Sequence, residues 1–246
     1  MSAAETDVAL AARLAAGAGD ILLDLQRDSG LVGKDLGKAG DVAANAWLMD
    51  ALRTARPGDA ILSEEEKDSA ARLSASRVWI IDPLDGTREY GEGRADWAVH
   101  VALSVDFRAA VGAVALPGLG LTLTSDAGAV LPPANDPPRM LVSRTRPAAE
   151  AVAVAAAIGA ELLPMGSAGA KAMAVVRGEA DIYLHTGGQY QWDNCAPVAV
   201  AAAYGLHCSR VDGAPLVYNE AETSLPDLLI CRPEWAARVL ALVAGR

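Results

Sequence analysis

The stretch Trp79-Ile80-Ile81-Asp82-Pro83-Leu84-Asp85-Gly86-Thr87 decides the fold, because a core strand and a candidate site meet within it. Val78–Ile81 is a short apolar run rich in β-branched residues, which predicts a buried strand. Pro83 cannot donate a hydrogen bond to a neighbouring strand, so we expect the strand to end there. Asp82 and Asp85 are therefore predicted to lie at the carboxyl end of a core strand.

The residues after this strand predict an anion site. A helix that begins near Thr87 would point free backbone N–H groups outward, and such a terminus binds anions. Two carboxylates beside an anion require cations between them, which is the layout of a metal-dependent phosphate enzyme. Asp-Pro-Leu-Asp-Gly also suits an ordinary turn, and this reading stays open for the stretch taken alone.

Composition limits the class of protein. The chain has 246 residues and 52% apolar content, enough for one large domain or two small ones. Its formal charge is 21 − 31 = −10 without a basic run, so we expect no nucleic-acid polymer as a partner. Three cysteines match no zinc or disulfide pattern, and the acidic start does not resemble a signal peptide. We predict a cytoplasmic protein that does not insert into membranes.

The first half is predicted to mix helices with an antiparallel meander. Hydrophobic periodicity predicts a helix over about 6–27. The glycines between Gly30 and Gly40 predict a loop or a flexible hairpin, and Asp41 is the expected N-cap of a helix over about 42–55. Apolar and alternating runs predict strands over 60–63, 97–105, 109–116 and 121–125.

The second half is predicted to alternate strands and helices. Four prolines between Leu131 and Arg139 predict a boundary, which gives an α+β half over 1–135 and an α/β half over 139–246. Asp193 is the expected N-cap of a helix with Pro197 in its first turn. The predicted strands are 140–143, 161–164, 180–184 and 226–231, and the predicted helices are 147–158, 167–177, 194–204 and 233–244.

Further carboxylates fall at the ends of predicted elements. Glu64 follows a strand within Ser63-Glu64-Glu65-Glu66, and Asp193 follows Trp192 before an alanine-rich run. Each acid, Asp41 included, has a simpler reading as a solvated turn or a helix cap. Together these acids would form a set of ligands made of oxygen atoms alone, because no His or Cys stands near them at the spacing of a metal ligand. Such a set favours Mg²⁺ over Zn²⁺.

Three blocks in this order resemble the inositol monophosphatase family of Mg²⁺-dependent, lithium-sensitive phosphatases: Ser63-Glu64-Glu65, Trp79 to Thr87, and Trp192-Asp193. The resemblance implies a layered αβαβα sandwich with the site between its halves, two or three Mg²⁺ ions and a homodimer. One ion would activate a water and another would stabilise the leaving oxygen. The resemblance assigns the metal ligands to Glu64, Asp82, the Leu84 carbonyl, Asp85 and Asp193, the water-orienting pair to Asp41 and Thr87, and phosphoryl contacts to the N–H groups of Gly86 and Thr87.

Within the family, the sequence is most similar to the branch that acts on 3′-phosphoadenosine 5′-phosphate. Arg88-Glu89, Val142-Ser143-Arg144 and Gly166-Ser167 with Lys171 carry this likeness. It implies hydrolysis of the 3′-phosphate in sulfate assimilation. The substrate-binding residues it implies are Gly86, Thr87, Arg144, Gly166, Ser167, Lys171 and Asp193.

Other functions remain open at this point. Inositol phosphatases of the family carry a Glu seven residues before the Asp of the Trp-Asp block, where this chain has Thr186. The alternative substrates are inositol 1-phosphate and fructose 1,6-bisphosphate, and the alternative outside enzymes is a non-catalytic, metal-binding regulatory relative. We expect His100 to be structural and Cys195 to be a buried, inert thiol.

Overall fold

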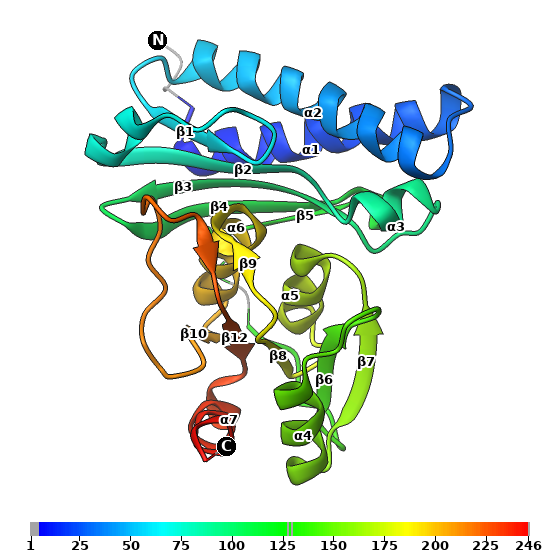
Figure 1. The fold of residues 1–246 in the computed structure, drawn as a ribbon, viewed down its shortest axis with the longest axis vertical. Coiled ribbons are helices and arrows are strands. Elements are labelled where there is room, and N and C mark those ends of the chain that lie inside the picture. The colour runs from blue at the N-terminus through cyan, green and yellow to red at the C-terminus, as the bar shows by residue number, and fades with distance from the viewer. Residues whose placement is uncertain (1–4, 127, 129, 246) are drawn as a thin grey trace.

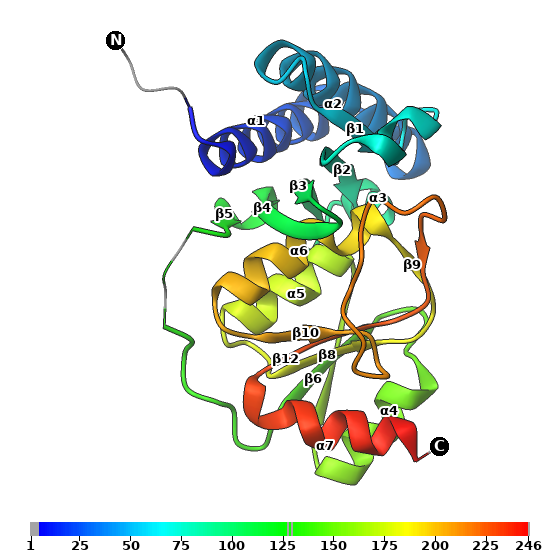
Figure 2. The ribbon, with the colours of Figure 1, turned by 90° about the vertical axis from the view of Figure 1, so that its left-hand side faces the viewer.

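The computed structural model describes residues 5–126, 128 and 130–245. Its helices and sheets stack as the predicted αβαβα sandwich (Figures 1 and 2). α1 and α2 cover the first sheet, α5 and α6 lie between the sheets, and α4 and α7 cover the second sheet. The helices are α1 (Asp7–Asp28), α2 (Gly33–Ala55), α3 (Thr87–Gly91), α4 (Ala149–Ile158), α5 (Ala168–Val176), α6 (Gln191–Ala203) and α7 (Pro233–Ala244).

The first sheet has the strand order β1-β2-β3-β4-β5. β1 is parallel to β2, and every later pair is antiparallel, so the predicted meander is confirmed. The strands are β1 (Ala60–Ser63), β2 (Arg77–Asp85), β3 (Ala98–Val105), β4 (Arg108–Leu116) and β5 (Leu121–Thr124), with short 3₁₀ helices over Ala70–Ser74 and Pro117–Leu119.

The second sheet has the strand order β10-β12-β8-β6-β7. β6 is parallel to β7 and β8, whereas β12 is antiparallel to β8 and β10. Its strands are β6 (Arg139–Ser143), β7 (Glu161–Met165), β8 (Ile182–His185), β10 (His207–Ser209) and β12 (Leu228–Cys231); β9 (Gln189–Tyr190) pairs separately with β11 (Ser224–Leu225). The sheets fall on either side of the proline-rich segment, and the division into halves 1–135 and 139–246 stays a prediction.

β2 lies between two hydrophobic clusters, so both of its faces are buried. Trp79 and Ile81 pack in the cluster under α1 and α2, whereas Val78 and Ile80 pack in the cluster that includes α5 and α6. Successive side chains of a strand point to opposite faces, so a strand between two cores needs a continuous apolar run. This is why Val78–Ile81 has no polar alternation.

The prediction that β2 ends at Pro83 is wrong. The strand continues to Asp85, with a register shift against β3 between Asp82 and Asp85. Asp82 pairs with His100 and Asp85 with Ala98, so β2 has one residue more than its partner across this interval. Such a bulge tolerates a proline, because the residues within it leave the regular hydrogen-bond ladder.

The predicted loop over Gly30–Gly40 is also wrong, because α2 already begins at Gly33 and Asp41 lies inside the helix. The helical glycines allow close packing. A Cβ on Gly37 would lie 2.6 Å from Cγ2 of Thr87, and one on Gly40 would lie 2.9 Å from Cε1 of Tyr90; both neighbours belong to α3. These glycines therefore let α2 approach α3, and they do not break the helix.

α6 begins earlier than predicted. Tyr190 is its N-cap, so Asp193 is not the cap but the third helical residue, with Oδ2 accepting a hydrogen bond of 2.6 Å from the Tyr190 N–H. Pro197 lies inside the helix and not in its first turn. An acid at this position still bonds the free N–H groups of the helix start, which keeps Asp193 fixed near β2.

Candidate metal centre and phosphate site

Three predicted ligands meet where β2 ends and α6 begins. Asp82, Asp85 and Asp193 each place one carboxylate oxygen within 4.8 Å of the oxygens of the other two. Asp82 and Asp85 are buried, and Asp193 is partly buried. The register shift in β2 keeps both of its aspartates at this edge, and the first turn of α6 supplies the third.

Asp85 is held by contacts from three elements. Its Oδ2 accepts hydrogen bonds from Ser167 Oγ at 2.5 Å and from the Gly169 N–H at 2.6 Å, and it lies 3.3 Å from His100 Nε2. Burial alone would raise the pKa of Asp85, but its interactions with His100, Ser167 and Gly169 lower the pKa to about 2. Asp85 therefore carries a fixed negative charge.

The other carboxylates show the cost of crowding negative charges. Burial, followed by the charges of Glu64 and Asp85, raises the pKa of Asp82 well above its usual value. Burial and the Asp85 charge raise the pKa of Asp193 to about 6. Glu64 is an exposed residue, yet desolvation of its carboxylate and the Asp193 charge raise its pKa to about 7. A bound cation would relieve this repulsion, and the all-oxygen donor set fits Mg²⁺.

Glu64 and Leu84 lie at the edge of this cluster. Glu64 shares a hydrogen bond with Asp82 but does not belong to the group of three converging oxygens. The Leu84 N–H donates to Asp82 Oδ1 at 3.0 Å, and the Leu84 carbonyl accepts from Thr87 Oγ1 at 3.2 Å. A carbonyl oxygen has two lone pairs, so Leu84 keeps one for a cation.

Asp41 and Thr87 form the predicted pair beside the cluster. Burial and the Glu65 charge raise the pKa of Asp41 to about 7, and the nearby side chain of Thr87 opposes this shift. The single hydroxyl proton of Thr87 is donated to the Leu84 carbonyl. The close approach of α2 at Gly37 brings the two residues together. The pair could orient a water molecule between the carboxylate and the hydroxyl.

Gly86 shapes the turn between β2 and α3. Its φ is +95°, in the left-handed region that favours glycine, and a Cβ there would lie 3.2 Å from the side chain of Ser167. The turn borders a cavity of about 310 Å³. The lining includes the predicted residues Gly86, Thr87, Arg144, Gly166, Ser167 and Lys171, together with Arg88, Glu89, Ser143, Thr145 and Arg146.

Lys171 lies under the Gly166-Ser167 turn. The side chain is buried, and Nζ donates to the carbonyl oxygens of Gly166 at 3.1 Å and Ser167 at 2.5 Å. Burial lowers the pKa of Lys171, and nearby carboxylates, Asp85 first, oppose the shift. Lys171 thus supports the turn that holds Asp85 and adds positive charge to the wall of the cavity.

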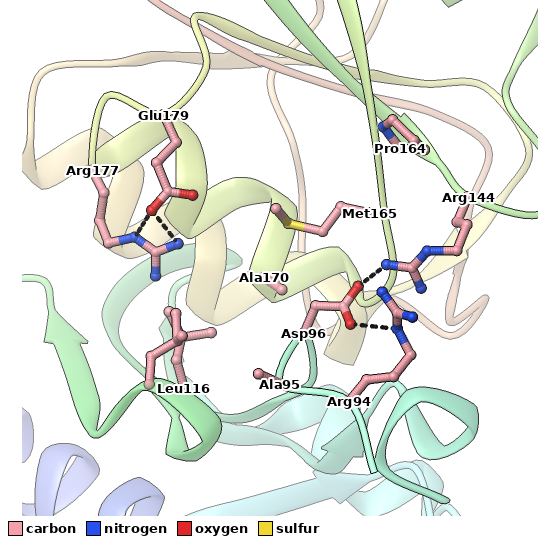
Figure 3. A pocket seen from close by; sticks show the side chains of 11 residues that line it. Arg94, Ala95, Asp96, Leu116, Arg144, Pro164, Met165, Ala170, Arg177 and Glu179 are labelled. Carbon is pink, nitrogen blue, oxygen red and sulfur yellow. Dashed lines mark hydrogen bonds and ion pairs between the residues drawn. The ribbon is translucent and has the colours of Figure 1, made fainter. Parts of the chain in front are cut away.

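Arg144 is committed to protein carboxylates. Nη1 lies 3.1 Å from Glu89 Oε1, and Nη2 pairs with Asp96. Figure 3 shows Arg94 and Arg144 converging on Asp96 beside a second cavity of about 380 Å³. By contrast, the side chains of Arg88 and Arg146 form no hydrogen bond or ion pair with any residue that the structure describes.

Thr186 has a carboxylate partner. Its Oγ1 donates a 2.6 Å hydrogen bond to Glu150 Oε2 on α4. A carboxylate from another element therefore lies beside the position where inositol phosphatases of the family carry their own Glu. Cys195 is buried, and burial raises its pKa, as expected for an inert thiol.

His100 is the site residue that sequence reasoning missed. It was expected to be structural, yet it contacts Asp85 and the Trp192 carbonyl. The available signal was its place in the predicted strand 97–105, which pairs with the strand that carries both aspartates. Spacing along the chain could not reveal a contact made across a sheet.

The chain belongs to the inositol monophosphatase family, whose model matches residues 3–244. Among curated relatives, it is 47% identical to a 3′-phosphoadenosine 5′-phosphate phosphatase of Mycobacterium leprae, over 97% of this chain and 93% of that protein. It is 31% identical to the 3′(2′),5′-bisphosphate nucleotidase CysQ of Escherichia coli K12, over 76% of this chain and 81% of that protein. The solved structure of CysQ from Bacteroides thetaiotaomicron has the same fold, with a TM-score of 0.80 and 23% sequence identity. The match covers 93% of this chain and 97% of that one.

Among the described residues, no helix combines the length and the apolar character that crossing a bilayer requires.

Proposed function

We propose that this protein is a Mg²⁺-dependent phosphomonoesterase that hydrolyses the 3′-phosphate of 3′-phosphoadenosine 5′-phosphate to AMP and phosphate, in sulfate assimilation. The observation that carries the proposal is the convergence of Asp82, Asp85 and Asp193 beside the Gly86 turn. The high identity to relatives named for this substrate supports the choice of nucleotide.

Each protein group has a role in this proposal. Asp82, Asp85, Asp193, Glu64 and the Leu84 carbonyl would hold two or three Mg²⁺ ions. Bound Mg²⁺ supplies charge neutralisation and Lewis acidity. Asp41 and Thr87 would orient the attacking water, and the Asp41 carboxylate would accept its proton. The backbone N–H groups of Gly86 and Thr87 would stabilise the charge that develops on the phosphoryl oxygens.

The 310 Å³ cavity would hold the rest of the nucleotide, with Gly166, Ser167, Lys171 and Arg144 as substrate-binding residues. The carboxylate partners of Arg144 weaken its part in this proposal. Arg88 and Arg146 line the same cavity, and their guanidinium groups form no ion pair with the part of the chain that the structure describes, so they are the better candidates for the second phosphate.

One observation favours a second candidate, inositol 1-phosphate. Glu150 lies beside Thr186 and could accept hydrogen bonds from ring hydroxyls in place of the missing family Glu. We also infer a homodimer, a cytoplasmic location and inhibition by Li⁺ from the family resemblance. Light scattering of the purified chain tests the first of these.

The test of the proposed function is phosphate release from 3′-phosphoadenosine 5′-phosphate by EDTA-treated protein as Mg²⁺ is added back. The expected result is no turnover without Mg²⁺ and saturable recovery with it. Asp193→Asn should need far more Mg²⁺, whereas Asp24→Asn, on the exposed face of α1, should behave like the unmodified protein. An equal rate of phosphate release with and without Mg²⁺ would contradict the proposal.

A further inference from the structure

We propose that His100 is a positioning residue of the metal centre, which fixes the ligand Asp85 against the helix that carries the ligand Asp193. The inference rests on the metal centre of the proposed function. It assigns a role to a residue that is itself too deeply buried to meet the substrate.

His100 lies in the middle of β3, directly opposite Asp82, and is 0% exposed. One ring nitrogen, Nδ1, shares a hydrogen bond of 3.0 Å with the Trp192 carbonyl oxygen. The other, Nε2, lies 3.3 Å from Asp85 Oδ2, a close polar contact that does not meet the geometry of a hydrogen bond, so Nε2 has no hydrogen-bond partner among the described residues. Trp192 directly precedes Asp193 in the first turn of α6. The side chain of His100 therefore contacts both the predicted ligand Asp85 and the backbone of the residue that precedes the predicted ligand Asp193.

The chain leaves room for this contact at one position of α5. A Cβ on Gly169 would lie only 2.0 Å from His100 Nε2, so the ring can occupy its place only beside a glycine. The Gly169 N–H donates to the same Oδ2 of Asp85 that faces the ring. β3, α5 and α6 thus meet at His100. β3 and α5 contact the predicted ligand Asp85 through His100 and Gly169, and α6 carries the predicted ligand Asp193.

These contacts have a consequence for metal binding. The three groups that face Oδ2 of Asp85 restrict its rotation, and the contact with the Trp192 carbonyl restricts α6. Polar neighbours that orient metal ligands typically change metal affinity 10- to 100-fold when they are removed. A histidine that only filled space would leave Mg²⁺ affinity unchanged when replaced by a residue of similar size.

The test is calorimetric titration of EDTA-treated protein with Mg²⁺ alone, which needs no turnover. His100→Leu keeps the bulk and removes both ring contacts, so it should weaken Mg²⁺ binding at least about tenfold. His100→Gln, which can present an amide N–H near the position of Nε2, should recover most of the affinity. Ser104→Ala is the matched control, since Ser104 is buried on the same strand and has no hydrogen-bond partner for Oγ among the described residues.

Thermal unfolding without Mg²⁺ separates folding from binding. Should His100→Leu fail to fold, His100→Asn serves instead, because an amide can still reach the Trp192 carbonyl while the contact with Asp85 is lost. Unchanged Mg²⁺ affinity in a folded Leu or Asn variant, or equal weakening in Ser104→Ala, would overturn the inference. Loss of Mg²⁺ affinity in His100→Leu together with rescue by Gln supports it, whichever phosphate ester the unmodified protein hydrolyses. Absence of turnover on 3′-phosphoadenosine 5′-phosphate would reject only the proposed function.

Discussion

At the scale of single residues, the chemistry depends on how one carboxylate is held. Asp85 keeps its negative charge in a buried site because Ser167, Gly169 and His100 all face Oδ2. Asp82 and Asp193 each accept one backbone hydrogen bond, from Leu84 and Tyr190, but burial and the neighbouring negative charges still raise their pKa values. Asp85 is therefore the carboxylate of the cluster whose negative charge is preserved most strongly.

Replacing Asp85 by Asn should abolish most of the activity. The change keeps the shape but removes the charge that balances the cations, so kcat should fall at least about 100-fold, the scale for losing a group that stabilises charge in the transition state. The measurement is steady-state phosphate release at saturating Mg²⁺, with circular dichroism to confirm folding. Turnover at the unmodified level in folded Asp85→Asn would refute its role as a ligand.

Lys171→Ala should affect two constants. Nζ holds the carbonyls of Gly166 and Ser167, so its loss should loosen the turn that bonds Asp85 and lower kcat. If Lys171 also attracts the second phosphate, KM for the bisphosphorylated nucleotide should rise more than KM for a substrate with one phosphate. Equal KM changes for both substrates would limit Lys171 to the structural role.

Arg144 and Arg146 should differ although they are neighbours in sequence. Arg144→Ala breaks two partly buried ion pairs and should lower the free energy of unfolding by about 1–3 kcal/mol in urea denaturation. Arg146→Ala should leave that free energy nearly unchanged and raise KM for the nucleotide. The reverse pattern would show that Arg144 is the residue that contacts substrate.

At the scale of elements, α2 determines how Thr87 is placed. Gly37→Ala would drive a Cβ to within 2.6 Å of Cγ2 of Thr87, so α2 and α3 would have to separate. We expect at least a tenfold loss of kcat from misplacing the Asp41–Thr87 pair and about 1–3 kcal/mol of destabilisation from overpacking. Gly58→Ala is the control, because nothing lies within 4 Å of its added Cβ. Equal kcat values for the two variants would contradict this account.

The errors of the sequence-based prediction also lie at this scale. Periodicity located β2 and the meander because their apolar runs face a core. It could not locate the start of α2, since Gly33, Gly37 and Gly40 disfavour a helix locally. Gly33 adopts a positive φ of +59°, and Gly37 and Gly40 pack closely against residues distant in sequence. The predicted end of β2 at Pro83 was wrong for the same reason. The bulge that accommodates this proline arises from the pairing of β2 with β3, which the local sequence does not show.

The site was more predictable than the boundaries of the elements around it. Asp82, Asp85 and Asp193 converge although the predicted strand end and helix cap were both misplaced. The three aspartates were identified from their sequence motifs. An error of a few residues in the predicted end of a strand or start of a helix does not move these side chains away from the edge of the sheet. His100 escaped prediction because its contacts cross from β3 to β2, α5 and α6, and no local pattern encodes them.

At the scale of the whole molecule, the cavity lies where α3, α5 and the segment after β6 come together beside the carboxylates. In the proposed function, the metal chemistry does not depend on the alcohol that departs. The cavity walls must then select the substrate. Arg88, Arg146 and Lys171 favour an ester with a second phosphate, whereas Glu150 beside Thr186 is the feature that could favour a polyol.

The most direct test of the central claim is therefore phosphate release from 3′-phosphoadenosine 5′-phosphate, inositol 1-phosphate and fructose 1,6-bisphosphate, measured side by side with and without Mg²⁺. We predict Mg²⁺-dependent turnover with kcat/KM for the nucleotide at least about tenfold above that for inositol 1-phosphate, a difference of roughly 1.4 kcal/mol in transition-state binding. A preference for inositol 1-phosphate would contradict the nucleotide assignment, and absence of turnover on all three would contradict the enzyme itself.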